Sequence, residues 1–310
     1  MRAALLPTPG NPEMLAYWLR NFETWREEVD ELYVFVNGAE TSENGRRAVE
    51  TAGGRYLYSP LSAGHDGALL TLLRATDADH VVLCEDDAYI RHPGAVRAAF
   101  ERIEGGHTDL VGSPRHEDYA TSPLMEWGPY QPGDLAELRH GLWPAFLFAR
   151  RADLLATDRI FGDRGWPRGG HIPGWGPVTP EACAFIGIAA EFVHLDTLIG
   201  TTIQLRAAGL RTELVHRVRV FDERATEEWV AADPPWFHVT GLSTLPGMLA
   251  APESLPDYGP GGGLWTRRLA WWQRCGIDVS AFIDRAAINR PEMARWHERF
   301  APWVTWEEQG

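Results

Sequence analysis

The feature that most limits the fold of this chain is a regular alternation of short apolar runs with segments of helical periodicity. The runs Ala3–Leu6, Leu32–Val36 and His80–Cys84 are continuously apolar after their first residues, as expected of strands covered on both faces. Each run is followed by a segment with helical spacing or helix-capping residues. Because parallel strands need a crossover connection, this order predicts an α/β fold with a mostly parallel central sheet and flanking helices.

The boundaries of the other elements follow from turn and capping residues. Asn11 is expected to cap a helix that starts at Pro12, and Gly53-Gly54 to end another. The predicted helices are 12 to about 25, Ser42–Ala52, Gly67–Ala75, Pro93–Glu104 and Thr197–Ala208. The remaining predicted strands are Arg55–Tyr58, Asp109–Val111, Ala145–Phe148 and Thr212–Val220.

Two later segments differ in composition from the rest of the chain. Gly162–Pro180 holds six glycines and four prolines, which predicts a connection without regular structure, either a lid over a site or a solvated connector. A second Pro/Gly-rich stretch begins near Pro246 and leads into a Trp-rich helical tail. We therefore expect a catalytic domain at 1–245 and a linker with a helical appendage at 246–310.

Composition excludes several classes of protein. No apolar run approaches the roughly 20 residues that span a bilayer, and the N-terminal run ends at Pro7, which predicts a cytoplasmic protein without a membrane span. The net charge of −14 disfavours nucleic acid and anionic membranes as partners. Three scattered cysteines indicate neither a disulfide framework nor a zinc site.

Three consecutive acids, Glu85-Asp86-Asp87, follow the run His80–Cys84 directly. Ligands of open parallel sheets bind at the carboxyl ends of strands, and adjacent carboxylates repel unless a cation neutralises them. The triplet therefore predicts a divalent cation site, with a solvated acidic turn as the alternative. Asp77-Ala78-Asp79 has a similar pattern but lies at the amino end of the same run, where no ligand is expected.

The order of motifs in the first half resembles the GT-A glycosyltransferases that use nucleotide sugars, in a family-two-like form. The resemblance is carried by Leu5-Leu6-Pro7-Thr8, the run Leu32–Val36, Ser62-Ala63-Gly64-His65, and the sequence HVVLCEDDAYI from His80. In that family the acid-x-acid motif holds Mn²⁺ or Mg²⁺ against the diphosphate of the donor. The resemblance covers about residues 3 to 240, and the C-terminal tail is outside it.

The resemblance implies roles for individual residues. Asp87 would be the metal ligand, and Glu85 or Asp86 would contact the ribose or a metal-bound water. A late histidine would complete the metal site: His238 is the choice, and His216 is the rival. The remaining nucleotide-sugar-binding residues implied are Pro7, Thr8 and Asn37 around the base, and Gly64, His65 and Asp66 near the nucleotide.

The same family places a catalytic base at the start of a helix that ends in a stretch like R-x-x-G. Asp196, followed by Arg206 and Gly209, fits that place, although the family has Glu-Asp where this chain has Leu195-Asp196. A helix N-terminus favours an ionised carboxylate, which suits a base. The alternative is an aspartate that only caps the helix.

These residues predict a hexosyltransferase that moves a sugar from a nucleotide-diphosphate sugar to an acceptor hydroxyl, with inversion expected and retention left open. The acceptor is expected to be a small molecule, glycan or peptide rather than nucleic acid. One rival is a sugar-nucleotidylyltransferase, but the segment Pro7–Asn11 lacks the basic residues of the phosphate-binding loop of that class. The other is a non-catalytic nucleotide- or carbohydrate-binding protein of the same fold.

Overall fold

The structure is a computed structural model, and it describes residues 1–10, 12–37, 43–61, 63–113, 142, 144–157, 165–167, 171–172, 176–177, 192–194, 198–215, 218–219 and 234–238. The helices are α1 (Pro12–Glu23), η1 (Arg26–Glu28), α2 (Glu43–Thr51), α3 (Gly64–Ala75), α4 (Gly94–Glu104), α6 (Arg151–Leu155) and α8 (Ile199–Ala207). The longer strands are β1 (Arg2–Thr8), β2 (Glu31–Asn37), β3 (Arg55–Ser59), β4 (His80–Cys84) and β7 (Phe146–Arg150). The shorter strands are β5 (Ala88–Ile90), β6 (Leu110–Gly112), β8 (Gly165–Pro167), β9 (His171–Ile172), β10 (Gly176–Pro177), β11 (Phe192–His194), β12 (Thr212–Leu214), β13 (Val218–Arg219) and β14 (Trp236–His238).

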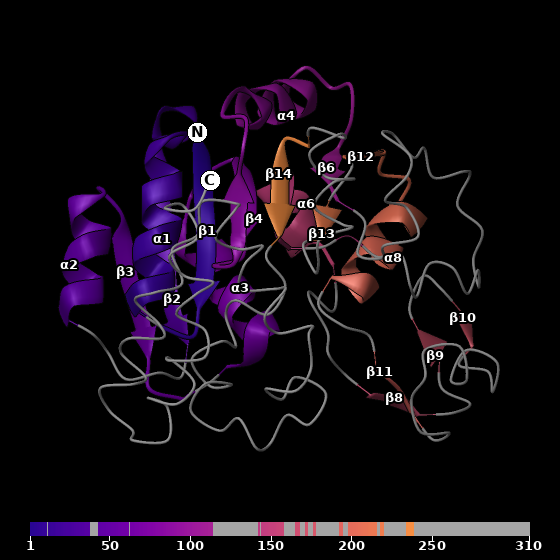
Figure 1. Cartoon of the computed structure of the whole chain (residues 1–310). Helices are drawn as coiled ribbons and strands as arrows, with labels where there is room; N and C mark the ends of the chain where they lie inside the picture. The colour runs from indigo at the N-terminus through magenta and orange to yellow at the C-terminus, as the bar shows by residue number, and fades with distance from the viewer. Residues whose placement is uncertain are drawn as a thin grey trace, which may run out of the picture.

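The centre of the fold is a seven-stranded sheet in the order β12-β6-β7-β4-β1-β2-β3. The pairs β1/β2, β1/β4, β2/β3 and β12/β6 are parallel, whereas β7 runs antiparallel to both of its neighbours. The sheet is therefore mostly parallel, and the α/β class predicted from the sequence is confirmed (Figure 1).

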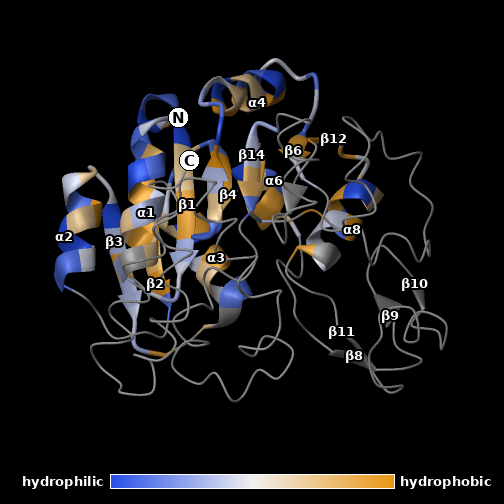
Figure 2. Cartoon of the chain, in the orientation of Figure 1, coloured by the Kyte–Doolittle hydropathy of each residue, from blue (hydrophilic) through white to orange (hydrophobic). Residues whose placement is uncertain are grey.

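Helices cover both faces of the sheet and divide the core in two. One apolar cluster packs residues of α1, α2 and α4, such as Trp18, Val49 and Phe100, against one face. The other packs residues of α3, α6 and α8 against the opposite face, with Leu72 and Leu205 among them. In Figure 2 the central strands β1 and β4 are largely apolar, and the flanking helices carry both apolar and polar residues. Coverage on both faces explains why the middle residues of β1, β2 and β4 are apolar and buried.

The strand order creates a switch point between β1 and β4. From β1 the chain adds β2 and then β3 on one side, and β4 lies on the other side of β1. In doubly wound sheets, ligands bind at the carboxyl ends of the two strands at such a switch point. Thr8 ends β1 and Cys84 ends β4, so the acidic triplet that follows Cys84 lies at this position.

A second sheet, β13-β14-β5, lies next to the switch point, because β5 follows the acidic triplet directly. β14 pairs antiparallel with β5, with Trp236 opposite Ile90 and His238 opposite Ala88. The Trp236 ring is buried near Phe146 and Phe148 of β7, with ring centroids 5.8 and 5.6 Å away. A segment about 150 residues after the acidic triplet is in this way anchored beside it.

Some boundaries differ from the sequence predictions. The stretch Gly162–Pro180, expected to lack regular structure, contains β8, β9 and β10; β8 pairs with β11, and β9 with β10. α8 starts at Ile199 rather than Thr197, after Leu198 in a left-handed conformation with φ of 69°. The predicted tail at 246–310 lies outside the described residues. No helix in the described part of the chain is long and apolar enough to cross a membrane.

The anchoring of Trp236 gives a first testable prediction. Its indole Nε1–H donates a 2.7 Å hydrogen bond to Ser113 Oγ in a buried environment. Ser113→Ala leaves that donor unpaired, and should lower the free energy of unfolding by about 1–3 kcal/mol. Ser59→Ala, which removes an exposed hydroxyl bonded to Leu61, should change it by less than about 0.5 kcal/mol. Urea denaturation measures both; equal effects would show that the buried bond does not anchor β14.

Candidate metal centre

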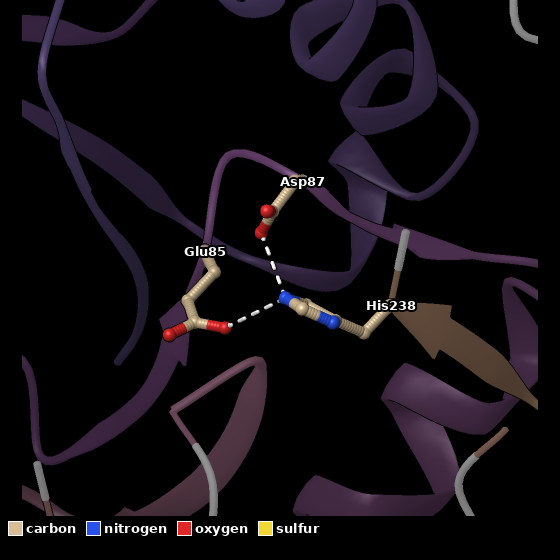
Figure 3. Close-up of side chains that lie close together, drawn as sticks. All are labelled: Glu85, Asp87 and His238. Carbon is tan, nitrogen blue, oxygen red and sulfur yellow. Dashed lines mark ion pairs between the residues drawn. The ribbon is translucent and has the colours of Figure 1, made fainter. Parts of the chain in front are cut away.

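Three side chains that could hold a metal ion converge at the switch point. His238 Nε2 lies 3.0 Å from Asp87 Oδ1 and 3.4 Å from Glu85 Oε2. One ligand atom from each residue lies within 4.8 Å of the other two. Figure 3 shows the imidazole between the two carboxylates, which approach it from the turn after β4. We call Glu85, Asp87 and His238 the triad.

Two elements bring the triad together. Glu85 and Asp87 lie in the turn between β4 and β5, which is closed by a backbone hydrogen bond from Ala88 N to Glu85 O. His238 ends β14, and its partner in the β5 ladder is Ala88, the residue directly after Asp87. The antiparallel pairing of β5 with β14 thus sets the imidazole beside the acidic turn.

The donor set fits a divalent cation. Bonds from a common ion to carboxylate oxygen or imidazole nitrogen are about 2.0–2.2 Å long, so opposite ligand atoms lie roughly twice that distance apart. The three ligand atoms of the triad lie within 4.8 Å of one another, a separation comparable to that of two ligands on opposite sides of one ion. Three protein ligands leave further coordination positions for phosphate or water oxygens.

The middle acid has a different environment. Asp86 is 5 % exposed, and its Oδ2 accepts a 2.8 Å hydrogen bond from Thr8 Oγ1 at the end of β1. Thr8 Oγ1 also accepts a hydrogen bond from Gly10 N. Burial, followed by the charge of Asp87, raises the pKa of Asp86 to about 8, although the bond from Thr8 opposes this. Burial therefore favours the neutral form of Asp86, whereas a cation bound in the turn would favour the charged form of the acids around it.

The residues expected around the nucleotide lie at the same edge of the sheet. Pro7 and Thr8 close β1, and Asn37 closes β2. Asn37 Oδ1 accepts a 2.7 Å hydrogen bond from Ala63 N, which fixes the entry to α3 beside the end of β2. Gly64, His65 and Asp66 form the first turn of α3. Thr8 and Asp86 are bonded to each other, so in this arrangement their side chains join β1 to the acidic turn.

Two sequence expectations concern residues outside the described part of the chain. Asp196 falls between β11 and α8, and His216 between β12 and β13. α8 begins after Leu198, so Asp196 lies before the first described residue of this helix, and its alternative role as a cap stays a prediction. Asp196 as base and His216 as rival ligand stay predictions.

The structure changes the expectation for Glu85 and agrees with the one for Asp79. Glu85, assigned to the ribose or a metal-bound water, places its carboxylate against His238 as closely as a ligand would. Asp79, at the other end of β4, is 74 % exposed and pairs with the N-terminal amine at 3.1 Å. The two acidic motifs thus lie at opposite ends of one strand, as the sequence predicts.

Comparisons with known proteins identify no family for the chain. No family model matches it, and no curated protein matches it. Among solved structures, it is similar to glucosyl-3-phosphoglycerate synthase from Mycobacterium tuberculosis in complex with Mn²⁺, UDP and glucosyl-3-phosphoglycerate. That match has 20% identity and a TM-score of 0.38, and covers 55% of this chain and 60% of the synthase.

Two further structures show the breadth of the likeness. S. aureus TarS matches with 12% identity and a TM-score of 0.46, over 82% of this chain and 65% of TarS. A nucleotidyl transferase from Methanothermobacter thermautotroptrophicus matches with 13% identity and a TM-score of 0.39, over 69% of this chain and 86% of that protein. The same synthase in complex with Mn²⁺ and UDP-glucose also matches, with 23% identity and a TM-score of 0.38. At identities this low, the comparisons concern the fold alone.

Proposed function

We propose that the chain is a metal-dependent glycosyltransferase that moves a sugar from a nucleotide-diphosphate sugar to an acceptor hydroxyl. The observation that carries the proposal is the triad of two carboxylates and one imidazole at the switch point between β1 and β4. Doubly wound sheets bind nucleotides at such a point, and a cation held there faces the phosphates of the ligand.

The composition of the triad favours Mn²⁺ over Mg²⁺. Magnesium prefers oxygen ligands in near-ideal octahedral geometry and keeps several waters, whereas imidazole nitrogen suits transition metals better. His238 supplies such a nitrogen and is 5 % exposed, so it is fixed where it meets Asp87. Mn²⁺ accepts both the carboxylates and the imidazole.

Each part of the site has a place in the reaction. A bound cation would take up negative charge that develops on the departing nucleoside diphosphate. Glu85, Asp87 and His238 would hold it, while Thr8 and Asp86 keep the acidic turn against β1. Asp196 would take the proton of the acceptor hydroxyl as that oxygen attacks the anomeric carbon, a single displacement that inverts the centre.

The composition of the loop after β1 disfavours the nucleotidylyltransferase alternative. Its residues Pro9 and Gly10 lead into α1 through Asn11 and Pro12, and none of them is basic. A transferase that binds a nucleoside triphosphate needs cationic or Gly-rich contacts for the phosphates in that loop. A transferase that binds a nucleotide sugar does not need such contacts in this loop, because a cation binds the diphosphate.

One experiment separates the three functions. The chain is incubated with Mn²⁺, a panel of UDP-, GDP- and dTDP-sugars and candidate acceptors, and release of nucleoside diphosphate is followed. A glycosyltransferase releases nucleoside diphosphate and a glycosylated acceptor. In a parallel reaction that contains nucleoside triphosphates and sugar phosphates instead, a nucleotidylyltransferase releases pyrophosphate. A binding protein gives neither, but is stabilised by about 2.7 kcal/mol when the ligand is at 100 times its Kd.

The metal ligands give a second testable prediction. Asp87→Ala should weaken Mn²⁺ binding by at least about 100-fold, beyond the 10–100-fold typical of a contact outside the ligand shell, and abolish transfer. Asp79→Ala removes an acid from the opposite end of β4 and should leave both unchanged. Electron paramagnetic resonance of free Mn²⁺ gives the affinities. Similar affinities for the two variants would place the metal elsewhere.

The proposed base gives a third testable prediction. Asp196→Asn keeps the size of the side chain but removes its basicity, so transfer should fall by roughly 100-fold or more while Mn²⁺ affinity stays within a factor of two. Initial rates at saturating donor, together with the Mn²⁺ titration, provide the measurement. If this variant turns over at the wild-type rate, Asp196 is not the base.

A further inference from the structure

The triad depends on a very short strand. β5 has three residues, Ala88–Ile90, and Asp87 directly precedes it. Its pairing with β14 places His238 opposite Ala88, so a shift of β5 along β14 would move Asp87 away from the imidazole. A ladder this short needs additional support to hold one register.

The support comes from α1. Asn21 Nδ2 donates a 2.8 Å hydrogen bond to Ile90 O, and Ile90 N donates one of 2.8 Å to Asn21 Oδ1. Consecutive residues of a strand direct their backbone groups to opposite edges. Arg91 N donates to Pro235 O on the side of β14, so Ile90 faces the other edge, where the amide of Asn21 meets both of its groups. The side chain thus takes the place of a further strand.

Asn21 is itself held by the core. Its helical neighbours Trp18, Phe22 and Trp25 are buried in the first apolar cluster. The rings of Trp18 and Phe22 stack at 5.4 Å, and Trp25 meets Phe22 edge-on at 4.8 Å. This packing fixes the rotation of α1 about its axis, and with it the position of the amide.

The geometry points to Asn21 as a positioning residue of the metal centre, which sets Asp87 against His238 by fixing β5. The inference rests on the proposed function, because it assumes that the triad binds a cation. The side chain of Asn21 bonds to the backbone of Ile90, three residues after Asp87, and acts on the triad through it. Without the amide, the N–H and C=O groups of Ile90, a residue only 3 % exposed, lose their partners, and the register of β5 is held from one side alone.

The test compares Asn21→Leu and Asn21→Asp with the control Thr76→Ala. Asn21→Asp keeps an acceptor for Ile90 N but loses the donor to Ile90 O. Thr76 is fully buried, donates to Glu31 and accepts from Ala78 N, and lies before β4 at its amino end, away from the triad. The probes are Mn²⁺ alone, titrated by electron paramagnetic resonance, and amide hydrogen exchange without metal. Urea denaturation gives the free energy of unfolding of each variant, so that affinities can be compared at similar losses of stability.

We expect Asn21→Leu to raise the Kd for Mn²⁺ about 10-fold or more, as loss of an outer contact typically does, with a smaller rise for Asn21→Asp. Exchange at Ala88–Ile90 and Trp236–His238 should become faster in both. Thr76→Ala should lose comparable stability, keep its Kd within twofold, and leave exchange at these strands unchanged. Wild-type affinity and unchanged local exchange in Asn21→Leu would overturn the positioning role. If wild type itself does not bind Mn²⁺, the proposed function fails, and the exchange data still decide whether Asn21 holds β5.

Discussion

The placement of three consecutive acids at one edge of the sheet, with Asp86 and Asp87 buried and Glu85 partly buried, is the constraint on which the site depends. Asp86 is 5 % exposed, bonded to Thr8, and has a pKa raised to about 8 by burial and by the charge of Asp87. Glu85 and Asp87 face His238. Two carboxyl groups and one imidazole that converge in a poorly solvated turn form a donor set that a divalent transition-metal ion accepts. This donor set is the reason that we propose the triad as a metal site.

The sheet gives this turn its location, and elements distant in sequence give it its shape. The parallel pairing of β1 with β4 puts Thr8 beside the triplet, since their register runs Arg2 to His80 and Leu5 to Leu83. On the other side, β14 brings His238 from far along the chain. The buried Trp236 fixes β14 to β7, and Asn21 fixes β5 to α1. Two rigid layers of the core thus meet at the metal centre.

The strands and the acidic turn could be predicted from sequence because they follow from local patterns. A short apolar run such as that in His80–Cys84 indicates a strand buried on both faces. Because ligands of parallel sheets bind at the carboxyl ends of strands, Glu85–Asp87 is then a better candidate site than Asp77–Asp79. His238 could be chosen only by resemblance, because a lone histidine between aromatic residues has no pattern of its own. The contribution of Glu85 depends on the rotamers of the turn, and that of Asn21 on the backbone of Ile90, 69 residues away. Such contacts are set by tertiary packing, and the hydrophobic periodicity of the sequence does not predict them.

The central claim is that one divalent cation is bound by Glu85, Asp87 and His238. Anomalous diffraction from crystals grown with Mn²⁺ and a nucleoside diphosphate tests it most directly. The account predicts a single strong anomalous peak within coordination distance, about 2.0–2.3 Å, of Asp87 and His238, with phosphate oxygens completing the sphere. A peak at another group of residues, or none at the triad at saturating Mn²⁺, would contradict it.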